Sequence, residues 1–410
     1  MNKNNRWLYA VIGFIIMLLS GFVYAWSVLA KPISMSRPDW TATQLSLTFT
    51  LVMIFFCIGG MIAGFIGEKI PTKLYIITGG VLFFLGFFIT SKTESTIVLV
   101  YLGFGVVSGF AAGIIYNAVM SCLSAWFSDK QGLISGIMMM GFGISSFLVG
   151  KLYTAVTPFD GSDAWQTTFR MMGIIVLIIM LLCTILLKSP GNDFVPPVSS
   201  SRKTTRKPAL DVGPGVMLRK PAFWVYYIWV VLIGAAGLAV VSQGSGIAME
   251  TGPEISAGSI ATVVGLLSLF NGIGRVIFGT VFDKKGYRFT LTLDMIVYFI
   301  AILLMIFALR KGMFGLLTVS YIITGIAYGG VTPTGSALIS DFFGRTYYSK
   351  NFSVVTTTLM FSSMSSTIAG RLYDINKSYI STICMALGLL VLSFVISFGI
   401  RRPTSENAGK

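Results

Sequence analysis

The sequence of 410 residues contains no histidine, only 15 acidic residues and four cysteines. Without imidazole, the chain lacks the side chain that most often carries protons near neutral pH and the commonest nitrogen ligand for metals. The cysteines lie in apolar runs without the spacing of a metal site, so we expect small core residues rather than disulfides: Cys57, Cys122, Cys183 and Cys384. We therefore predict no metal, no other cofactor and no enzymatic activity.

Charged residues are scarce as well, at 11% of the chain against 55% hydrophobic residues. Soluble domains carry about a quarter charged residues, and the mean hydropathy here is +0.83. These values exclude a soluble protein and predict an all-α protein that crosses the lipid bilayer many times. The excess of 30 Lys and Arg over 15 Asp and Glu lies mostly in short loops beside apolar runs. There it orients the chain in the membrane, so we expect no nucleic-acid partner.

Twelve apolar runs are long enough to cross a bilayer of about 30 Å. They cover residues 7–30, 43–65, 74–90, 96–126, 133–156, 169–187, 223–249, 255–282, 290–309, 314–343, 353–373 and 379–400. Between the sixth and seventh runs, the proline-, serine- and lysine-rich segment 188–220 is typical of a flexible linker. We therefore predict a six-helix half over residues 1–187, a linker over 188–220, a second six-helix half over 221–402 and a tail over 403–410.

The distribution of basic residues predicts the orientation. With the N-terminus inside, 20 Lys and Arg fall in cytoplasmic segments and 9 in external ones. Because positive charge is retained on the inner side, we expect both termini and the linker in the cytoplasm, in a multi-pass protein of the inner (plasma) membrane.

The two halves repeat each other in sequence. Gly64, Glu68 and Lys69 follow the second run, and Gly279, Asp283 and Lys284 follow the eighth run at the same offsets, 215 positions later. A second echo ends the fifth and eleventh runs, where Gly150-Lys-Leu-Tyr153 matches Gly370-Arg-Leu-Tyr373. Two echoes at nearly one spacing indicate duplicated halves, and such proteins commonly bind their substrate near the midplane between the repeats.

Twelve spans, a long central loop and this duplicated loop motif resemble the major facilitator superfamily over essentially the whole chain. The first copy departs from the usual pattern because Glu68 and Pro71 replace the usual Asp and Gly. The resemblance implies two pseudo-symmetric halves that move by alternating access. It also implies that the two copies, Gly64, Glu68 and Lys69 with Gly279, Asp283 and Lys284, form ion-paired latches at the cytoplasmic face. The alternative is solvated loop charge.

Within that superfamily, the chain is similar to the oxalate/formate antiporter family and its monocarboxylate transporter relatives. The similarity lies in Tyr24-Ala-Trp-Ser27, in Gly113-Ile-Ile-Tyr116-Asn117, in Trp126-Phe127 with Gly132, and in Asn271-Gly-Ile-Gly-Arg275. It implies a carrier of small organic anions. Cationic drug efflux is an alternative, but it normally needs acids in the membrane core and a proline in the fifth span. A non-transporting nutrient sensor is another, usually with a longer cytoplasmic extension.

Arg275 is the strongest candidate for a binding residue. It stands well inside a predicted span, where a cation costs about 2.5–3.5 kcal/mol on insertion scales, and no acid within sequence reach would neutralise it. Asn271 lies one helical turn away on the same face. A guanidinium binds a carboxylate through two parallel hydrogen bonds, and the amide adds a donor. The alternatives are that Arg275 bonds backbone carbonyls of a neighbouring broken helix or extends to the cytoplasmic end of the span, marked by Asp283.

Tyrosines in other spans complete the predicted site. Tyr116 and Tyr328 stand in glycine-rich stretches of the fourth and tenth spans, and Tyr24 stands in the first. Their hydroxyl groups would close a small polar cavity around an anion. Ordinary packing is the alternative for each of the three.

The count of charges favours a monocarboxylate such as lactate, pyruvate or formate. Oxalate carriers of the family are expected to present a lysine in the eleventh span, but residues 353–367 contain none. Asn271 replaces an acid that is expected in proton-coupled relatives, and Asp294 is interpreted as a partner of loop bases. Antiport against a counter-anion and symport with a proton both stay open, as does oxalate/formate exchange. We expect a monomer.

Overall fold

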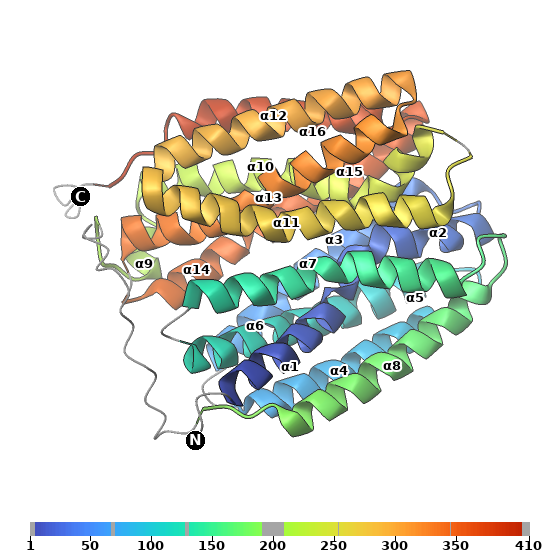
Figure 1. Ribbon diagram of the computed structural model, residues 1–410, viewed down its shortest axis with the longest axis horizontal. Coiled ribbons are helices and arrows are strands. Elements are labelled where there is room, and N and C mark those ends of the chain that lie inside the picture. The colour runs from blue at the N-terminus through green and yellow to red at the C-terminus, as the bar shows by residue number, and fades with distance from the viewer. Residues whose placement is uncertain are drawn as a thin grey trace.

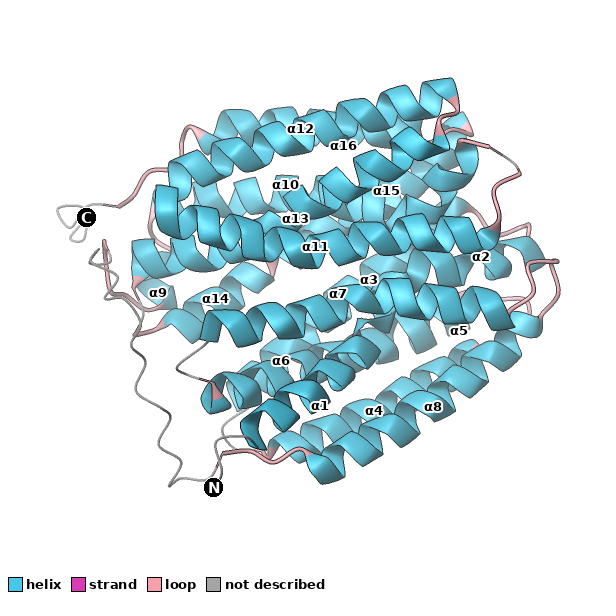
Figure 2. Ribbon diagram, viewed as in Figure 1, coloured by secondary structure: helices cyan, strands magenta, loops and turns pink. Residues whose placement is uncertain are grey.

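The computed structural model describes residues 5–66, 70–127, 131–190, 209–252, 254–344 and 346–403. Within these ranges every regular element is helical (Figure 2). Eleven of the described helices are long and apolar enough to cross a membrane. The prediction of an all-α membrane protein is therefore confirmed.

The first half consists of ten helical elements. They are α1 (Asn5–Ser20), η1 (Gly21–Ala25), α2 (Trp26–Ser36), α3 (Ala42–Ile66), α4 (Thr72–Thr90), α5 (Val98–Val100), η2 (Tyr101–Ser108), α6 (Gly109–Trp126), α7 (Gln131–Val156) and α8 (Ala164–Leu186). The first predicted span is α1, η1 and α2 in succession, with a 3₁₀ segment at its middle. The fourth contains a π-helical segment, η2, of the kind often found at functional sites.

The second half contains eight helices. They are α9 (Pro214–Met217), α10 (Pro221–Glu250), α11 (Ala257–Lys285), α12 (Tyr287–Lys311), α13 (Phe314–Phe343), α14 (Tyr348–Thr356), α15 (Thr358–Asn376) and α16 (Ile380–Ser397). In Figure 1 the two halves form two adjacent bundles, with α7 of the first beside α11 of the second. We call the end where α1 begins and α16 ends the terminal end, and the opposite end the distal end.

The eleventh predicted span is helical but divided, because α14 ends at Thr356 and α15 begins at Thr358. The hydroxyl groups of Thr356, Thr357 and Thr358 each donate to a backbone carbonyl three or four residues earlier. Such back-bonding hides the polar groups from lipid and often bends a helix. The serine and threonine content of α15 also explains why it is absent from the eleven strongly apolar helices.

Part of the predicted linker is ordered. The backbone of residues 209–212 hydrogen-bonds to the carbonyls of Asp341, Phe342 and Phe343 at the end of α13. Met217 in α9 is fully buried. Residues 209–220 therefore pack on the second half, and the expectation of a flexible linker was wrong for this part; residues 191–208 lie outside the described residues.

The described hydrogen bonds between the halves lie at the distal end and the middle of the helices. At the distal end, the Asp374 carboxylate of α15 accepts bonds from the backbone N–H groups of Ala42 and Thr43, at 2.9 and 2.8 Å. Gln243 of α10 donates to Ser46, and Lys151 of α7 donates to the Gly258 carbonyl. The two glycines of the second sequence echo lie here as well, since Gly150 packs against Ala261 and Gly370 against Ala42.

Three of the four cysteines are buried, as expected of small core residues, but Cys384 is exposed on α16. The core prediction was wrong for Cys384. Apolar residues of a membrane-spanning helix can face lipid as well as protein, so an apolar run does not by itself identify the buried side.

Candidate functional site

Arg275 lies on α11 at the contact between the two halves. Its Nη1 donates to the backbone carbonyl of Met139 on α7, at 3.1 Å. Its Nε is buried without a hydrogen-bond partner. Among the described residues, no carboxylate forms an ion pair with it. The carbonyl bond expected as an alternative therefore forms, but it occupies one donor and leaves the positive charge without a counter-charge.

Four of the five predicted binding residues line one cavity. This cavity, called the arginine cavity below, has an empty volume of about 270 Å³, open solvent included. Its walls are Tyr24, Phe142, Gly143, Val241, Leu267, Ser268, Asn271, Arg275 and Tyr328. Tyr116 is not among these wall residues, but its hydroxyl interacts electrostatically with the Arg275 guanidinium. The tertiary structure thus brings the predicted binding residues, which stand in four different predicted spans, to one place.

Close packing of α11 against α13 sets Asn271 beside Tyr328. A Cβ atom at Gly329 would overlap the Asn271 carbonyl, and one at Gly274 would overlap the Ile326 carbonyl. Small residues on facing helices allow backbones to approach this closely in a membrane. The glycines that surround Tyr328 in the sequence therefore position the tyrosine against the helix that carries Arg275.

An aromatic cluster supports the site from the first half. Phe142 of α7 makes T-shaped contacts with Tyr24 and Tyr116, with ring centroids 5.3 Å apart in both pairs. Phe56 of α3 packs on Tyr116 at 5.4 Å. Rings in this arrangement restrict one another, so Phe142 and Phe56 hold the two tyrosines in place. Sequence reasoning missed both residues because one phenylalanine among 32 carries no distinguishing pattern.

The tyrosine hydroxyls leave donors available. Within the described part of the chain, the hydroxyl groups of Tyr24, Tyr116 and Tyr328 have no hydrogen-bond partner and are not sealed from solvent. Tyr24 and Tyr328 also interact electrostatically with Arg275. One fixed positive charge with several neutral donors complements a ligand that carries one negative charge.

Asp294 is not a partner of loop bases, as its position near a helix end led us to expect. It is fully buried in α12, and neither carboxylate oxygen has a hydrogen-bond partner among the described residues. Tyr298, one turn later, is its electrostatic neighbour. Asp294 is buried because the rotation of α12 directs position 294 into the bundle rather than toward the loop.

We expect Asp294→Asn to raise the melting temperature of the purified protein. A buried carboxylate without a partner costs free energy, whereas the neutral amide has nearly the same shape. A gain of at least about 1 kcal/mol is expected, because an unpartnered buried carboxylate costs more than an unpartnered neutral amide. Thermal unfolding in detergent measures it, with Asp283→Asn as the control because Asp283 is exposed. A lower melting temperature for Asp294→Asn would contradict this expectation.

The predicted latch stays a prediction. Asp283 and Lys284 are exposed at the end of α11 and form no ion pair in the described ranges, whereas Glu68 and Lys69 lie outside those ranges. Gly64 lies near the Asn117 side chain, and Gly279 near Pro333.

Comparison with known proteins decides the family. The family model described as Major Facilitator Superfamily matches residues 12–311 and 249–410. The chain belongs to the Major Facilitator Superfamily. This transporter is 26% identical over 351 residues to the oxalate:formate antiporter of Oxalobacter formigenes, covering 85% of this chain and 80% of the relative.

Two further similarities come from a sequence relative and from a solved structure. Apicoplast pyruvate carrier 1 of Toxoplasma gondii is 24% identical over 322 residues, which cover 66% of this chain and 57% of the carrier. A bacterial homologue of the human lysosomal transporter Spinster, in an inward-facing and occupied conformation, superimposes with a TM-score of 0.75. The alignment covers 98% of this chain and 97% of the other at 13% identity, so it supports the fold alone.

Proposed function

We propose that this transporter carries small monocarboxylates of the lactate, pyruvate or formate class across the membrane. The observation that carries the proposal is the uncompensated Arg275 guanidinium in a cavity between the halves. A carboxylate would satisfy its charge through paired hydrogen bonds, and Asn271 with Tyr24, Tyr116 and Tyr328 would bind the remaining oxygens. The similarity to an oxalate:formate antiporter and to a pyruvate carrier supports a carboxylate as the substrate.

Transport would proceed by alternating access. Arg275 of the second half bonds Met139 of the first half, so a rocking motion of the halves changes the surroundings of the charge. The distal hydrogen bonds of Asp374, Gln243 and Lys151 would hold the site closed from that end. When the halves close at the terminal end instead, the latch residues Gly64, Glu68 and Lys69 with Gly279, Asp283 and Lys284 would take over this role.

The coupling between substrate binding and the movement of the two halves depends on the positive charge of Arg275. A bound monocarboxylate neutralises Arg275 and lowers the cost of moving the site through the membrane interior. This gives exchange of one anion for another, or symport if a proton binds elsewhere, because Asn271 does not titrate. We place the terminal end in the cytoplasm of an inner-membrane, monomeric carrier, following the distribution of basic loop residues.

Oxalate/formate exchange is the second candidate, because the antiporter relative carries that name. Oxalate has two negative charges, however, and the arginine cavity offers one positive charge. Leaving a second carboxylate without a cation in a poorly hydrated site costs several kcal/mol. A monocarboxylate is therefore the better match to the charges.

In proteoliposomes, labelled pyruvate or lactate is expected to enter at least about tenfold faster than labelled oxalate at equal concentration. Burying the second, uncompensated charge of oxalate costs more than about 1.4 kcal/mol, which corresponds to a factor of ten. Empty liposomes give the background. Uptake that internal monocarboxylate stimulates without a pH gradient would establish exchange. Uptake that requires an inward proton gradient would establish symport. Preference for oxalate over every monocarboxylate would refute the charge argument.

A further inference from the structure

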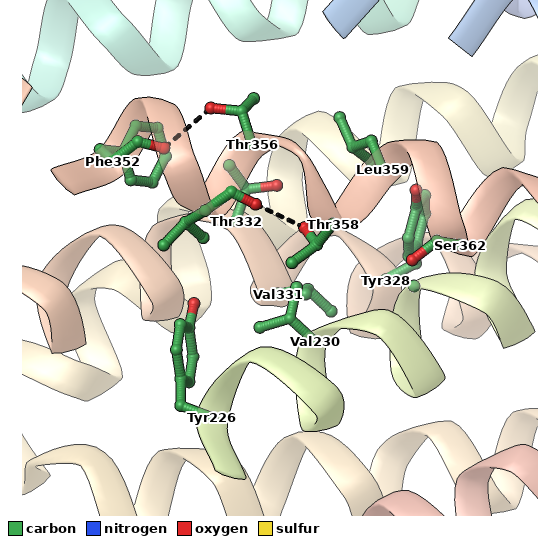
Figure 3. A pocket seen from close by; sticks show the side chains of 12 residues that line it. Tyr226, Val230, Tyr328, Val331, Thr332, Phe352, Thr356, Thr358, Leu359 and Ser362 are labelled. Atoms are coloured by element: carbon green, nitrogen blue, oxygen red, sulfur yellow. Dashed lines mark hydrogen bonds between the residues drawn. The ribbon is translucent and has the colours of Figure 1, made fainter. Parts of the chain in front are cut away.

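A second cavity lies within the second half (Figure 3). Helices α10, α13, α14 and α15 line it, and its empty volume, which includes open solvent, is about 500 Å³. Tyr328 lines both cavities. A ligand that bound Arg275 through its carboxylate and extended past Tyr328 would enter this second cavity.

The polar groups of the second cavity divide into acceptors and donors. The hydroxyls of Thr356, Thr358 and Ser362 already donate to the carbonyls of Phe352, Val355 and Val231, at 2.8, 2.7 and 2.9 Å. Each hydroxyl has one proton, so these oxygens can only accept a further bond.

The donors come from α10 and α13. The hydroxyl groups of Tyr226, Tyr328 and Thr332 have no hydrogen-bond partner among the described residues, so their protons are available. Carbonyl and hydroxyl oxygens of a ligand would accept from them, and ligand hydroxyl groups would donate to the acceptor set.

No charged side chain lines the second cavity in the part of the chain that the structure describes. The remaining walls are apolar, chiefly valine, leucine and phenylalanine side chains. A second ionised group of a substrate would lose its hydration here without gaining a counter-charge. Uncharged carbon chains with keto or hydroxyl groups meet no such penalty.

We propose that the two cavities form one binding site in which the second cavity receives an uncharged, keto- or hydroxyl-bearing chain attached to the carboxylate. This inference rests on the proposed function and extends its substrate class from lactate, pyruvate and formate to longer keto or hydroxy monocarboxylates, which would bind more tightly. Tyr226 and Thr332 then determine specificity for the chain, while Arg275 binds the carboxylate. Pyruvate would occupy the arginine cavity and leave the second cavity unfilled.

The test is a competition series against labelled pyruvate in proteoliposomes, using 2-oxo monocarboxylates of three to six carbons and 2-oxoglutarate. Each added methylene group is expected to strengthen inhibition about threefold to fourfold, so 2-oxohexanoate inhibits at least tenfold more strongly than pyruvate. 2-Oxoglutarate, which has a second carboxylate, is expected to inhibit more weakly than 2-oxopentanoate. Thermal stabilisation of the purified protein by each acid gives a second measurement that does not require transport.

Variants separate this inference from the proposed function. Tyr226→Phe and Thr332→Val each remove a donor without a described partner, so folding is expected to be retained. Both should weaken inhibition by 6-hydroxy-2-oxohexanoate, whose chain hydroxyl can accept from these donors, about fivefold, while inhibition by 2-oxohexanoate and by unlabelled pyruvate stays unchanged. Thr318→Val is the matched control, because Thr318 lies on α13 outside both cavities.

Two results would overturn the inference: equal inhibition by all chain lengths, or 2-oxoglutarate as the strongest inhibitor. In either case pyruvate would still be transported. If the proposed function itself fails, neither uptake of pyruvate nor stabilisation by any member of the series is observed.

Discussion

Arg275→Ala is expected to reduce uptake of labelled pyruvate by at least about 100-fold. Two hydrogen bonds between a guanidinium and a carboxylate contribute roughly 3–6 kcal/mol, since each bond to a charged group is worth about 1.5–3 kcal/mol, and 1.4 kcal/mol is a factor of ten. Arg275→Lys keeps the charge but loses the planar pair of donors. We therefore expect Arg275→Lys to retain about a tenth of wild-type uptake.

The control for this prediction is Arg310→Ala, which removes a positive charge from the same half. Arg310 is exposed near the end of α12, so uptake should match wild type. Melting temperatures of all three variants must be measured, because loss of the Met139 bond alone costs about 1 kcal/mol. Full transport by a folded Arg275→Ala protein would show that the arginine does not bind the substrate.

Gly329→Ala is expected to destabilise the transporter by roughly 1–3 kcal/mol, the usual cost of adding a methyl group to a packed core. The new Cβ would overlap the Asn271 carbonyl and lie 3.1 Å from the Asn271 Cα. Backbone atoms cannot rotate away, so α11 and α13 must separate. Because Asn271 and Tyr328 move with their helices, the apparent affinity for pyruvate should also fall.

Gly315→Ala is the matched control, since a Cβ at Gly315, at the start of the same helix, has no neighbour within 4 Å. There the substitution should be neutral or slightly stabilising, because alanine favours helix over glycine by about 1 kcal/mol. Thermal unfolding in detergent compares the two variants. Equal melting temperatures would mean that the close approach of α11 and α13 adjusts without cost.

The binding site was predictable where it depends on a single helix. Asn271 and Arg275 are four residues apart, and any α-helix places such a pair on one face. Tyr24 and Tyr328 line the same cavity as this pair. Their positions depend on how helices from both halves pack, which the sequence does not show. From the sequence, ordinary packing is an alternative for each tyrosine.

Other parts of the site could not be predicted. Phe142 holds two tyrosines at once, yet the sequence alone does not distinguish it from the other phenylalanines of the spans. Asp294 is interpreted from the sequence as a partner of loop bases because it stands near the end of a span, but the rotation of α12 buries it. The second cavity depends on α14 and α15 meeting at Thr356 to Thr358, where hydroxyl groups bond their own backbone.

The sequence by itself determined that this chain is a helical membrane protein of two related halves. Hydropathy and helical spacing act within single segments, because the bilayer requires each span to satisfy its own backbone hydrogen bonds. The tertiary structure decided which polar groups pair with protein and which stay free. Pairing requires atoms from different helices within about 3 Å, so only the packing shows that the Arg275 charge has no described counter-charge and that its cavity shares Tyr328 with an uncharged one.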